Sequence, residues 1–168
     1  MAAGGRGDGE AFWRFSLAFY ACPGVAPALI ALQDRSGRDV NVILHALWLG
    51  LVRGYAMSAA DLVVAEAAAA PLREAVVVEL RGLRRRLRAH PDPDVQVLRR
   101  RVQALEVAAE RAVQGRLAAS LAASVEPRAT APADRLEMAL ANLALYLGAA
   151  SAESETIGAA LVGFSRHA

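Results

Sequence analysis

The chain contains no lysine and only one cysteine, Cys22. All 19 basic residues are therefore arginine, which a GC-rich coding bias explains more simply than selection for bidentate contacts. A single cysteine excludes an intramolecular disulfide and fits a reducing compartment. The formal net charge of +2 is too small to indicate a polyanionic partner by itself.

Long apolar runs are also missing. The uncharged run from Val40 to Val52 contains Asn41 and His45 and is shorter than the roughly 20 residues that a bilayer-spanning helix needs. The first apolar segment carries Glu10 and Arg14, which makes it a poor signal-peptide core. We therefore expect a soluble, cytoplasmic protein that has no membrane partner.

Strand patterns are absent, aromatic residues are few, and β-branched residues are scattered. Alanine and leucine dominate the composition, which favours helices. At 168 residues, a single domain with its own core is the default. We predict an all-α, single-domain helical bundle of six or seven helices over residues 10–168, preceded by a disordered tail over residues 1–9.

Capping and helix-breaking residues divide the chain before residue 71 into four predicted helices. They cover approximately residues 10–21, 26–37, 38–53 and 58–70. Pro23 and Gly37 end the first two helices. Ser58 and Asp61 form a capping pair that opens the fourth helix, and Pro71 should kink or break it.

Residues 72–123 predict a long antiparallel helical hairpin. Each arm has apolar positions three or four residues apart, as in a coiled coil: Leu72, Val76, Leu80, Leu83 and Leu87, then Val95, Leu98, Val102, Leu105, Ala109 and Ala112. Asp92 should cap the second arm, with Pro93 at its first position. We expect Leu80, Leu83 and Leu87 to pair with Val95, Leu98 and Val102, and the arginines to point outward.

Two more helices complete the prediction. Residues 133–147 present Leu136, Leu140, Leu143 and Leu147 as a core face, and a last helix capped by Ser151 buries Ile157, Leu161 and Phe164. We expect this C-terminal pair to fold against residues 10–54. Trp13, Phe15 or Phe19, and Trp48 should be buried together.

The first candidate site is a polar corner between the second and third helices. Its residues are Tyr20, Gln33, Asp34, Asp39, Asn41, His45 and Trp48. Asn41, His45 and Trp48 share one helical face. Together with the nearby carboxylates of the corner, the amide of Asn41 and the imidazole of His45 could bind a ligand or perform acid–base chemistry. The structural alternative, which we favour, makes Asp39 an N-cap, Asn41 a partner of buried backbone groups and His45 a hydrogen-bonded core residue.

The second candidate site is the arginine-rich half of the hairpin near its tip. Its residues are Arg81, Arg84, Arg85, Arg88, Arg99 and Arg100, with Arg86 and Arg101 beside them, and only Asp92 and Asp94 oppose them locally. Such a surface could bind RNA phosphates or an acidic protein surface. No aromatic residue interleaves with these arginines, so base stacking is unsupported. A solvated charged face is the structural alternative, which we favour here too.

Other chemistry finds no support in the sequence. The histidines His45, His90 and His167 fall in a predicted helix, a turn and the C-terminal tail, so we expect no metal site. Neither a phosphate-binding glycine loop nor a nucleophile elbow is present. We therefore expect no cofactor and no catalytic residues, and we favour a non-enzymatic role.

The segment from Phe12 to Trp48 resembles a family of small bacterial proteins that carries only a domain-of-unknown-function label. The matching residues are Phe12-Trp13, Ser16, Tyr20, Pro23-Gly24-Val25, Leu32-Gln33-Asp34, Gly37, Asp39-Val40-Asn41, Leu44 and Trp48. The resemblance covers about a quarter of the chain. It implies an all-helical cytoplasmic protein and supplies no catalytic residues.

Three functional hypotheses remain. The first, which the two helix-pairing seams favour, is an interaction or adaptor protein that binds another protein or itself through helix faces. The second is a nucleic-acid- or ribosome-associated factor that uses the arginine-rich tip. The third is a small-ligand binder or enzyme that uses the polar corner at residues 33–48.

Overall fold

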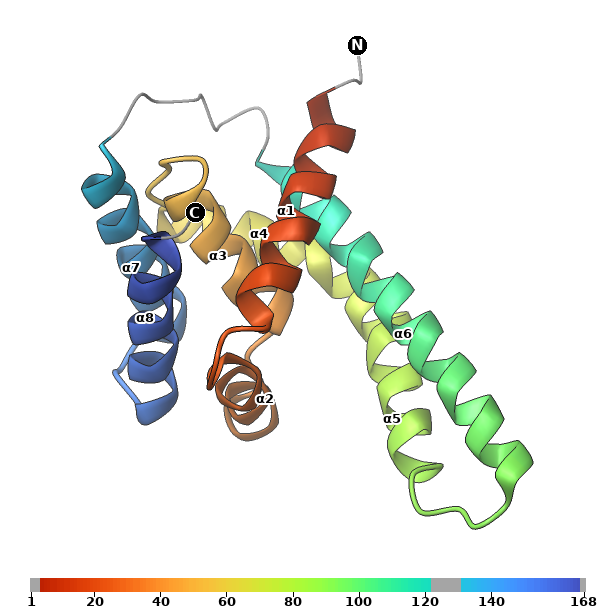
Figure 1. Ribbon diagram of the computed structural model, residues 1–168. Helices are drawn as coiled ribbons and strands as arrows, with labels where there is room; N and C mark the ends of the chain where they lie inside the picture. The colour runs from red at the N-terminus through yellow and green to blue at the C-terminus, as the bar shows by residue number, and fades with distance from the viewer. Residues whose placement is uncertain (1–3, 122–130, 167–168) are drawn as a thin grey trace.

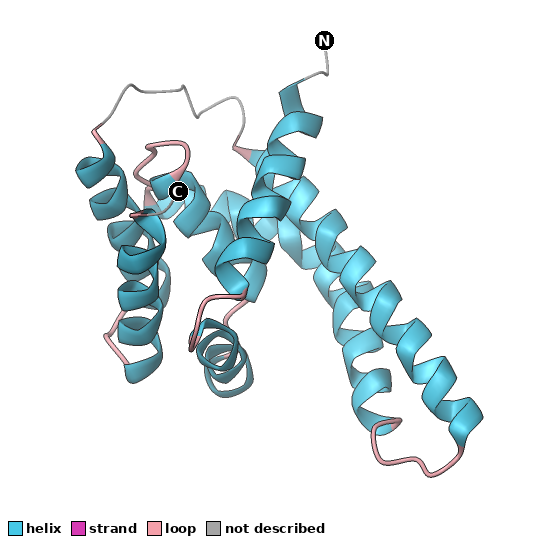
Figure 2. Ribbon diagram, in the orientation of Figure 1, coloured by secondary structure: helices cyan, strands magenta, loops and turns pink. Residues whose placement is uncertain are grey.

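The computed structural model describes residues 4–121 and 131–166, and all regular structure in these residues is helical (Figures 1 and 2). The elements are α1 (Gly4–Tyr20), α2 (Val25–Ser36), α3 (Val40–Leu51), α4 (Ala59–Leu72), the π-helical turn η1 (Arg73–Val77), α5 (Val78–Arg86), α6 (Pro93–Ser120), α7 (Pro132–Leu147) and α8 (Ala152–Ser165). Because α4, η1 and α5 are continuous in sequence, these ranges form seven helical segments. The all-α prediction is confirmed.

Helix α1 begins earlier than predicted. It starts at Gly4, so the expectation of a disordered tail is wrong for residues 4–9, whereas residues 1–3 lie outside the described part of the chain. Tertiary contacts hold this first part of the helix. Asp8 forms an ion pair with Arg53 at 2.6 Å. The helix also passes close to α6, since a Cβ atom built at Gly9 would lie 3.5 Å from the Cα of Gly115.

Helix α3 lies at the centre of the fold. All ten residues from position 41 to position 50 are buried, because α7 packs against α3 and helices α1, α2 and α6 contact it as well. Gly50 permits the close approach of α7, since a Cβ atom there would come within 2.3 Å of the Ala139 backbone. The N-terminal helices therefore fold against the C-terminal pair, as expected.

The aromatic core differs in part from the prediction. Trp48 is buried, but its ring neighbours are Phe12 and His45, with ring centroids 5.3 and 6.0 Å away. Trp13 is only half-buried, and the Arg111 guanidinium lies 5.7 Å from its ring centroid. The prediction that Trp13 joins Trp48 in the core is wrong, because Phe12, the preceding residue of α1, occupies the position beside Trp48.

A second aromatic cluster joins α1 to α8. Phe15 and Phe19 are buried and stack with centroids 5.9 Å apart, and Phe164 meets both rings edge-on. Ile157 and Leu161 of the predicted stripe of α8 are buried, whereas Phe164 is only partly buried. The cluster fixes the C-terminal helix against the first one.

The buried face of α7 is also different from the predicted one. Of the four predicted leucines only Leu143 is buried, whereas Ala139, Asn142 and Tyr146 are its buried neighbours. The Asn142 amide explains this rotation. It donates hydrogen bonds to the Ala46 and Tyr55 carbonyls at 3.0 and 2.9 Å, and it accepts one from the Met57 N–H at 2.8 Å.

Pro71 neither ends nor breaks its helix. The chain continues from α4 through η1, where the Val78 N–H bonds to the Arg73 carbonyl five residues back, into α5. A π-helical turn of this kind widens the helix locally and adjusts the backbone near the proline. The predicted disruption thus takes the form of a wider turn.

Helices α5 and α6 form the predicted antiparallel hairpin, which extends away from the body of the molecule (Figure 1). Asp92 caps α6 by accepting a hydrogen bond from the Asp94 N–H at 2.8 Å, and Pro93 is its first residue. The predicted seam is wrong in part. Leu98 and Leu105 are 52% and 59% exposed, because Glu106, Val113 and Leu117 are buried instead.

Candidate functional site

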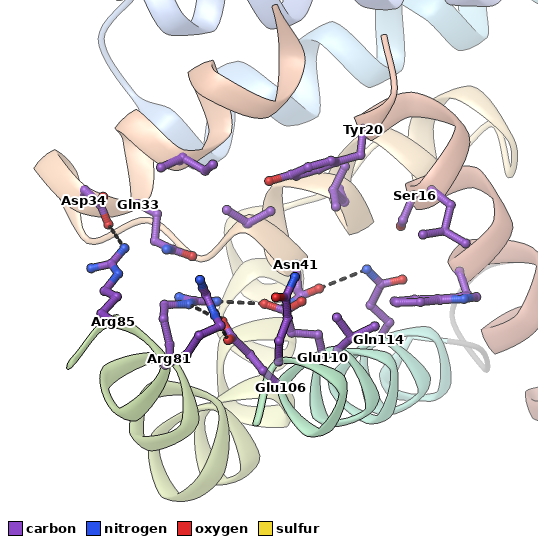
Figure 3. Close-up of a pocket in the computed structure, with 18 of the residues that line it drawn as sticks. Ser16, Tyr20, Gln33, Asp34, Asn41, Arg81, Arg85, Glu106, Glu110 and Gln114 are labelled. Carbon is purple, nitrogen blue, oxygen red and sulfur yellow. Dashed lines mark hydrogen bonds and ion pairs between the residues drawn. The ribbon is translucent and has the colours of Figure 1, made fainter. Parts of the chain in front are cut away.

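A groove of about 820 Å³ separates the hairpin from the corner formed by α1, α2 and the start of α3 (Figure 3). Its volume lies within the range of small-molecule sites, about 300–1,000 Å³. The groove brings together residues from the two candidate sites that the sequence analysis kept separate. Figure 3 shows Tyr20 and Gln33 on one side of it and Arg81 and Arg85 on the other.

Most of the candidate residues line this groove. From the polar corner these are Tyr20, Gln33, Asp34 and Asn41, and from the hairpin they are Arg81, Arg84, Arg85, Arg88 and Arg99. Four candidates do not line it, namely Asp39, His45, Trp48 and Arg100. Residues of the two predicted sites therefore lie on the two walls of one groove.

Three carboxylates pair with arginines inside the groove. Arg81 donates hydrogen bonds to Glu106 at 3.1 Å and to Glu110 at 2.8 Å, and Arg84 also binds Glu106. Across the groove, Arg85 binds Asp34 at 2.8 Å. The expectation that these arginines point outward, opposed only by Asp92 and Asp94, is wrong because α6 supplies acidic partners at positions 106 and 110.

Two arginines of the groove have no such partner. Among the described residues, no carboxylate lies within ion-pair distance of Arg88 or Arg99. The Arg99 Nε atom is buried, and no hydrogen-bond acceptor reaches it from the described part of the chain. A buried guanidinium N–H without an acceptor is costly, so this position suits an anionic group.

The other end of the groove holds two more buried polar atoms without partners in the described residues. Ser16 is 3% exposed and Gln114 is 2% exposed. The Ser16 Oγ and the Gln114 Oε1 form no hydrogen bond, although the Gln114 Nε2 donates to the Asn41 Oδ1 at 2.9 Å. Native proteins leave few such atoms unpaired, so each of them marks a position for a ligand group or a water molecule.

The two glutamates of α6 differ in their protonation behaviour. Burial raises the pKa of Glu110 above its ordinary value, although Arg81 acts in the opposite direction. Burial also acts to raise the pKa of Glu106, but hydrogen bonds from Arg84 and Arg81 outweigh it and hold that pKa below its ordinary value. Glu106 is therefore the fixed charge of the groove, and Glu110 is the carboxyl that holds its proton more readily.

One tyrosine and one aspartate of the opposite wall also have shifted pKa values. Burial and the neighbouring Glu110 raise the pKa of Tyr20, so its hydroxyl remains protonated and available as a donor. The hydrogen bond from Arg85 lowers the pKa of Asp34, which keeps that carboxylate ionised. Both walls thus present defined charges near neutral pH.

His45 lies in the core, away from the groove. It is fully buried between Phe12 and Trp48, and burial lowers its pKa to about 3. The expected hydrogen bond from His45 to a neighbour is wrong, because neither ring nitrogen has a partner in the described residues. An imidazole in these surroundings is neutral and has no access to a ligand.

Asp39 acts as the predicted N-cap of α3. Its Oδ1 accepts a hydrogen bond from the Asn41 N–H at 2.7 Å, and its Oδ2 binds Arg73 at 3.0 Å. Glu66 accepts hydrogen bonds from Arg73 at 2.7 Å and from the Tyr146 hydroxyl at 2.6 Å. The carboxylate of Asp39 is therefore committed to a buried network that joins α3, α4, η1 and α7.

Several groove residues escaped the sequence analysis. They are Trp13, Ser16, Gln103, Glu106, Glu110 and Gln114. On α6 the groove follows positions 99, 103, 106, 110 and 114, whose spacing of three or four places them along one helical face. A search for a polar stripe at this spacing would have found it. The sequence analysis instead assigned the buried face of this helix to the apolar residues at neighbouring positions.

The described residues were also compared with the requirements for a metal site and for a membrane-spanning helix. Within residues 4–121 and 131–166, no group of three or more His, Cys, Asp or Glu side chains is placed to hold a metal ion. In the same ranges no single helix has the length and apolarity for a bilayer span. One pair, Gly7–Tyr20 with Val25–Ser36, meets these two criteria jointly, and a 103° bend separates its helices.

Comparison with known proteins identifies a family. Residues 11–117 match the family described as "Protein of unknown function (DUF2390)". The chain belongs to this family. The match includes the segment from Phe12 to Trp48 and extends through the hairpin, so it covers both walls of the groove. No curated protein and no solved structure matches the chain.

Proposed function

We propose that this protein binds a small molecule that carries a carboxylate or phosphate group in the groove between the α1–α2 corner and the hairpin. The observation that carries the proposal is that one cavity of suitable volume contains arginines and buried polar atoms that have no partner among the described residues. Of the three sequence hypotheses, this is the small-ligand alternative, with its site extended to the hairpin.

The anionic group fits the end of the groove near the hairpin tip. Arg88 and Arg99 provide guanidinium groups there that no carboxylate of the described residues neutralises. One arginine in the turn after α5 and one on α6 can bind a single carboxylate or phosphate from two sides. Arg81, Arg84 and Arg85 are already paired with carboxylates, so Arg88 and Arg99 are the cations of this wall that are open to a ligand.

The rest of the ligand is elongated and has a hydrogen-bond donor at its inner end. An α-helix rises about 1.5 Å per residue, so Arg99 and Gln114 lie about 22 Å apart along α6. The Gln114 Oε1 accepts hydrogen bonds only, whereas the Ser16 hydroxyl can donate or accept. Leu17, Ile30 and Val107 also line the groove and suit an apolar portion of the ligand.

A ligand screen followed by calorimetry tests the proposal. Carboxylates and phosphate esters are compared in a thermal-shift assay with their uncharged analogues, and the best binder is titrated calorimetrically. Arg99→Gln should weaken its binding by about 10- to 100-fold, because a hydrogen bond to a charged group contributes about 1.5–3 kcal/mol. Arg100→Gln is the matched control, since Arg100 is exposed and lies outside the groove.

The control separates binding in the groove from general charge attraction. If Arg100→Gln weakens binding as much as Arg99→Gln, the anion is attracted by the whole basic arm. If no anion in the screen raises the melting temperature above the effect of its uncharged analogue, the proposal is rejected. A wild-type affinity in the Arg99→Gln variant also rejects it.

The adaptor hypothesis remains the second candidate, because apolar side chains of the hairpin face solvent, including Leu98 and Leu105. Nucleic-acid binding is less favoured, because Glu106, Glu110 and Asp34 neutralise three arginines of the candidate surface. Retention on heparin or RNA with a steep salt dependence would favour that role. A cytoplasmic location is part of the proposal and rests on the single cysteine.

A further inference from the structure

The hairpin has an apolar side that faces away from the groove. We call it the hairpin back face and define it by Leu83, Leu87, Leu98 and Leu105. Each of these leucines directly precedes a residue that lines the groove, namely Arg84, Arg88, Arg99 and Glu106. One residue step turns a helix by about 100°. In this antiparallel pair the step places the leucines of both arms on the side of the hairpin that faces away from the groove.

Nothing in the described residues covers the hairpin back face. Leu98 and Leu105 are 52% and 59% exposed, and Leu83 and Leu87 are only half-buried. Figure 1 shows that α5 and the first half of α6 extend beyond the rest of the molecule. Among the described elements, α5 packs mainly against α6 and the adjoining η1.

The spacing of these leucines is that of a helix-pairing seam. Positions 83 and 87 are four residues apart, and positions 98 and 105 are one heptad apart, with Val102 between them. A seam of this kind is fully buried only when further helices pack against it. Two helices alone leave its outer flank in water, as the exposure of Leu98 and Leu105 shows.

The charges beside the hairpin back face are complementary to those of an antiparallel copy. Glu79 lies at the base end of α5, whereas Arg86 lies at its tip end and Arg101 lies in the tip half of α6. Among the described residues none of the three has an ion-pair partner. When two hairpins pack antiparallel, the acidic base of each meets the basic tip of the other, so the pattern suits self-association.

From these observations we infer that the hairpin back face binds a second copy of this chain, so that two hairpins form an antiparallel four-helix bundle. The interface is self-complementary, as a two-fold dimer requires. The groove lies on the opposite side of each hairpin and stays open in the dimer. The inference is independent of the proposed ligand, because it uses none of the groove residues.

Analytical ultracentrifugation of the full chain tests this inference. The wild-type protein should sediment as a dimer that dissociates on dilution. The Leu98→Glu/Leu105→Glu variant should sediment as a monomer with an unchanged circular dichroism spectrum, because both side chains are already exposed. Val63→Glu is the matched control and should remain a dimer, since Val63 is 70% exposed on α4, outside the hairpin.

A charge exchange tests the antiparallel arrangement separately. Arg86→Glu/Arg101→Glu should weaken the dimer, and the additional change Glu79→Arg should restore it. A wild-type monomer at all concentrations overturns the inference, even if the hairpin captures a different protein. A Leu98→Glu/Leu105→Glu variant that still dimerises overturns it too, because the two copies then meet elsewhere. Failure of the Glu79→Arg rescue overturns the antiparallel arrangement.

Discussion

At the scale of single residues, His45 is the most unusual side chain of the core. It is fully buried beside Phe12 and Trp48, and neither of its nitrogens has a partner in the described residues. Its folded-state pKa of about 3 lies below the ordinary value of 6.5. Below pH 6.5 the unfolded chain therefore binds a proton that the folded protein does not. The free energy of unfolding must then decrease as the pH is lowered.

His45→Leu should remove this acid sensitivity. Protonation of the unfolded chain costs the wild type about 1.4 kcal/mol per pH unit, or about 5 kcal/mol by pH 3. The variant should be at least as stable as the wild type at pH 7, because no described hydrogen bond is lost and an apolar side chain replaces an unpartnered polar one. Urea unfolding at a series of pH values between 7 and 3 measures the difference.

His90→Gln is the control for this experiment. His90 is exposed at the hairpin tip, so its replacement should leave the difference between acid and neutral stability nearly unchanged. If His45→Leu loses as much stability on acidification as the wild type, another group controls the acid response and our account of His45 is wrong.

At the scale of elements, the start of α3 depends on one carboxylate. Asp39→Ala should lower the free energy of unfolding by about 1–2 kcal/mol, because α3 loses its N-cap. The Arg73 side chain keeps Glu66 as a partner, which limits the further loss. Asp39→Asn keeps a capping oxygen and should cost less. An equal loss in both variants would show that the charge of Asp39, rather than its cap, stabilises the helix.

Local signals predicted the element boundaries well. Gly37 ends α2 with a positive φ of 63°, Ser58 and Asp61 form the capping box of α4, and Asp92 caps α6, all as the sequence indicates. These signals work because each depends on a few neighbouring residues. The start of α1 was missed because tertiary contacts such as the Asp8–Arg53 ion pair hold its glycine-rich first turns.

The orientation of helices was harder to predict than their extent. Leu98 and Leu105 carry a convincing apolar pattern, yet in this half of α6 the buried residue is Glu106, because Arg81 and Arg84 neutralise it. A pattern of single residues cannot show that a charge is paired across two helices. Asn142 illustrates the same limit, since its hydrogen bonds to the loop before α4 determine which face of α7 is buried.

The candidate site was predicted in pieces for a related reason. Tyr20, Asp34 and Asn41 were found from the N-terminal half, and Arg81 and Arg99 from the hairpin, but their meeting depends on the packing of α1 on α6. Such long-range contacts are set by the whole fold. The sequence alone therefore does not show that these two groups of residues face each other across one groove.

At the scale of the whole molecule, the two tryptophans should contribute very differently to stability. Trp48→Ala leaves a large cavity beside α3 and should cost about 3–5 kcal/mol. Trp13→Ala removes a half-buried side chain at the groove and should cost about 1 kcal/mol. Thermal and urea unfolding of both variants measure the contrast. Equal losses would place Trp13 in the core after all.

The contrasting positions of these tryptophans also have an optical consequence. Trp48 is 2% exposed and should fluoresce at short wavelengths, whereas Trp13 lines the groove, is partly hydrated and should fluoresce at longer wavelengths. With Trp48 replaced by phenylalanine, all remaining indole emission comes from the groove. The protein thus contains its own reporter of groove occupancy, and a shift in that emission would follow binding without any added label.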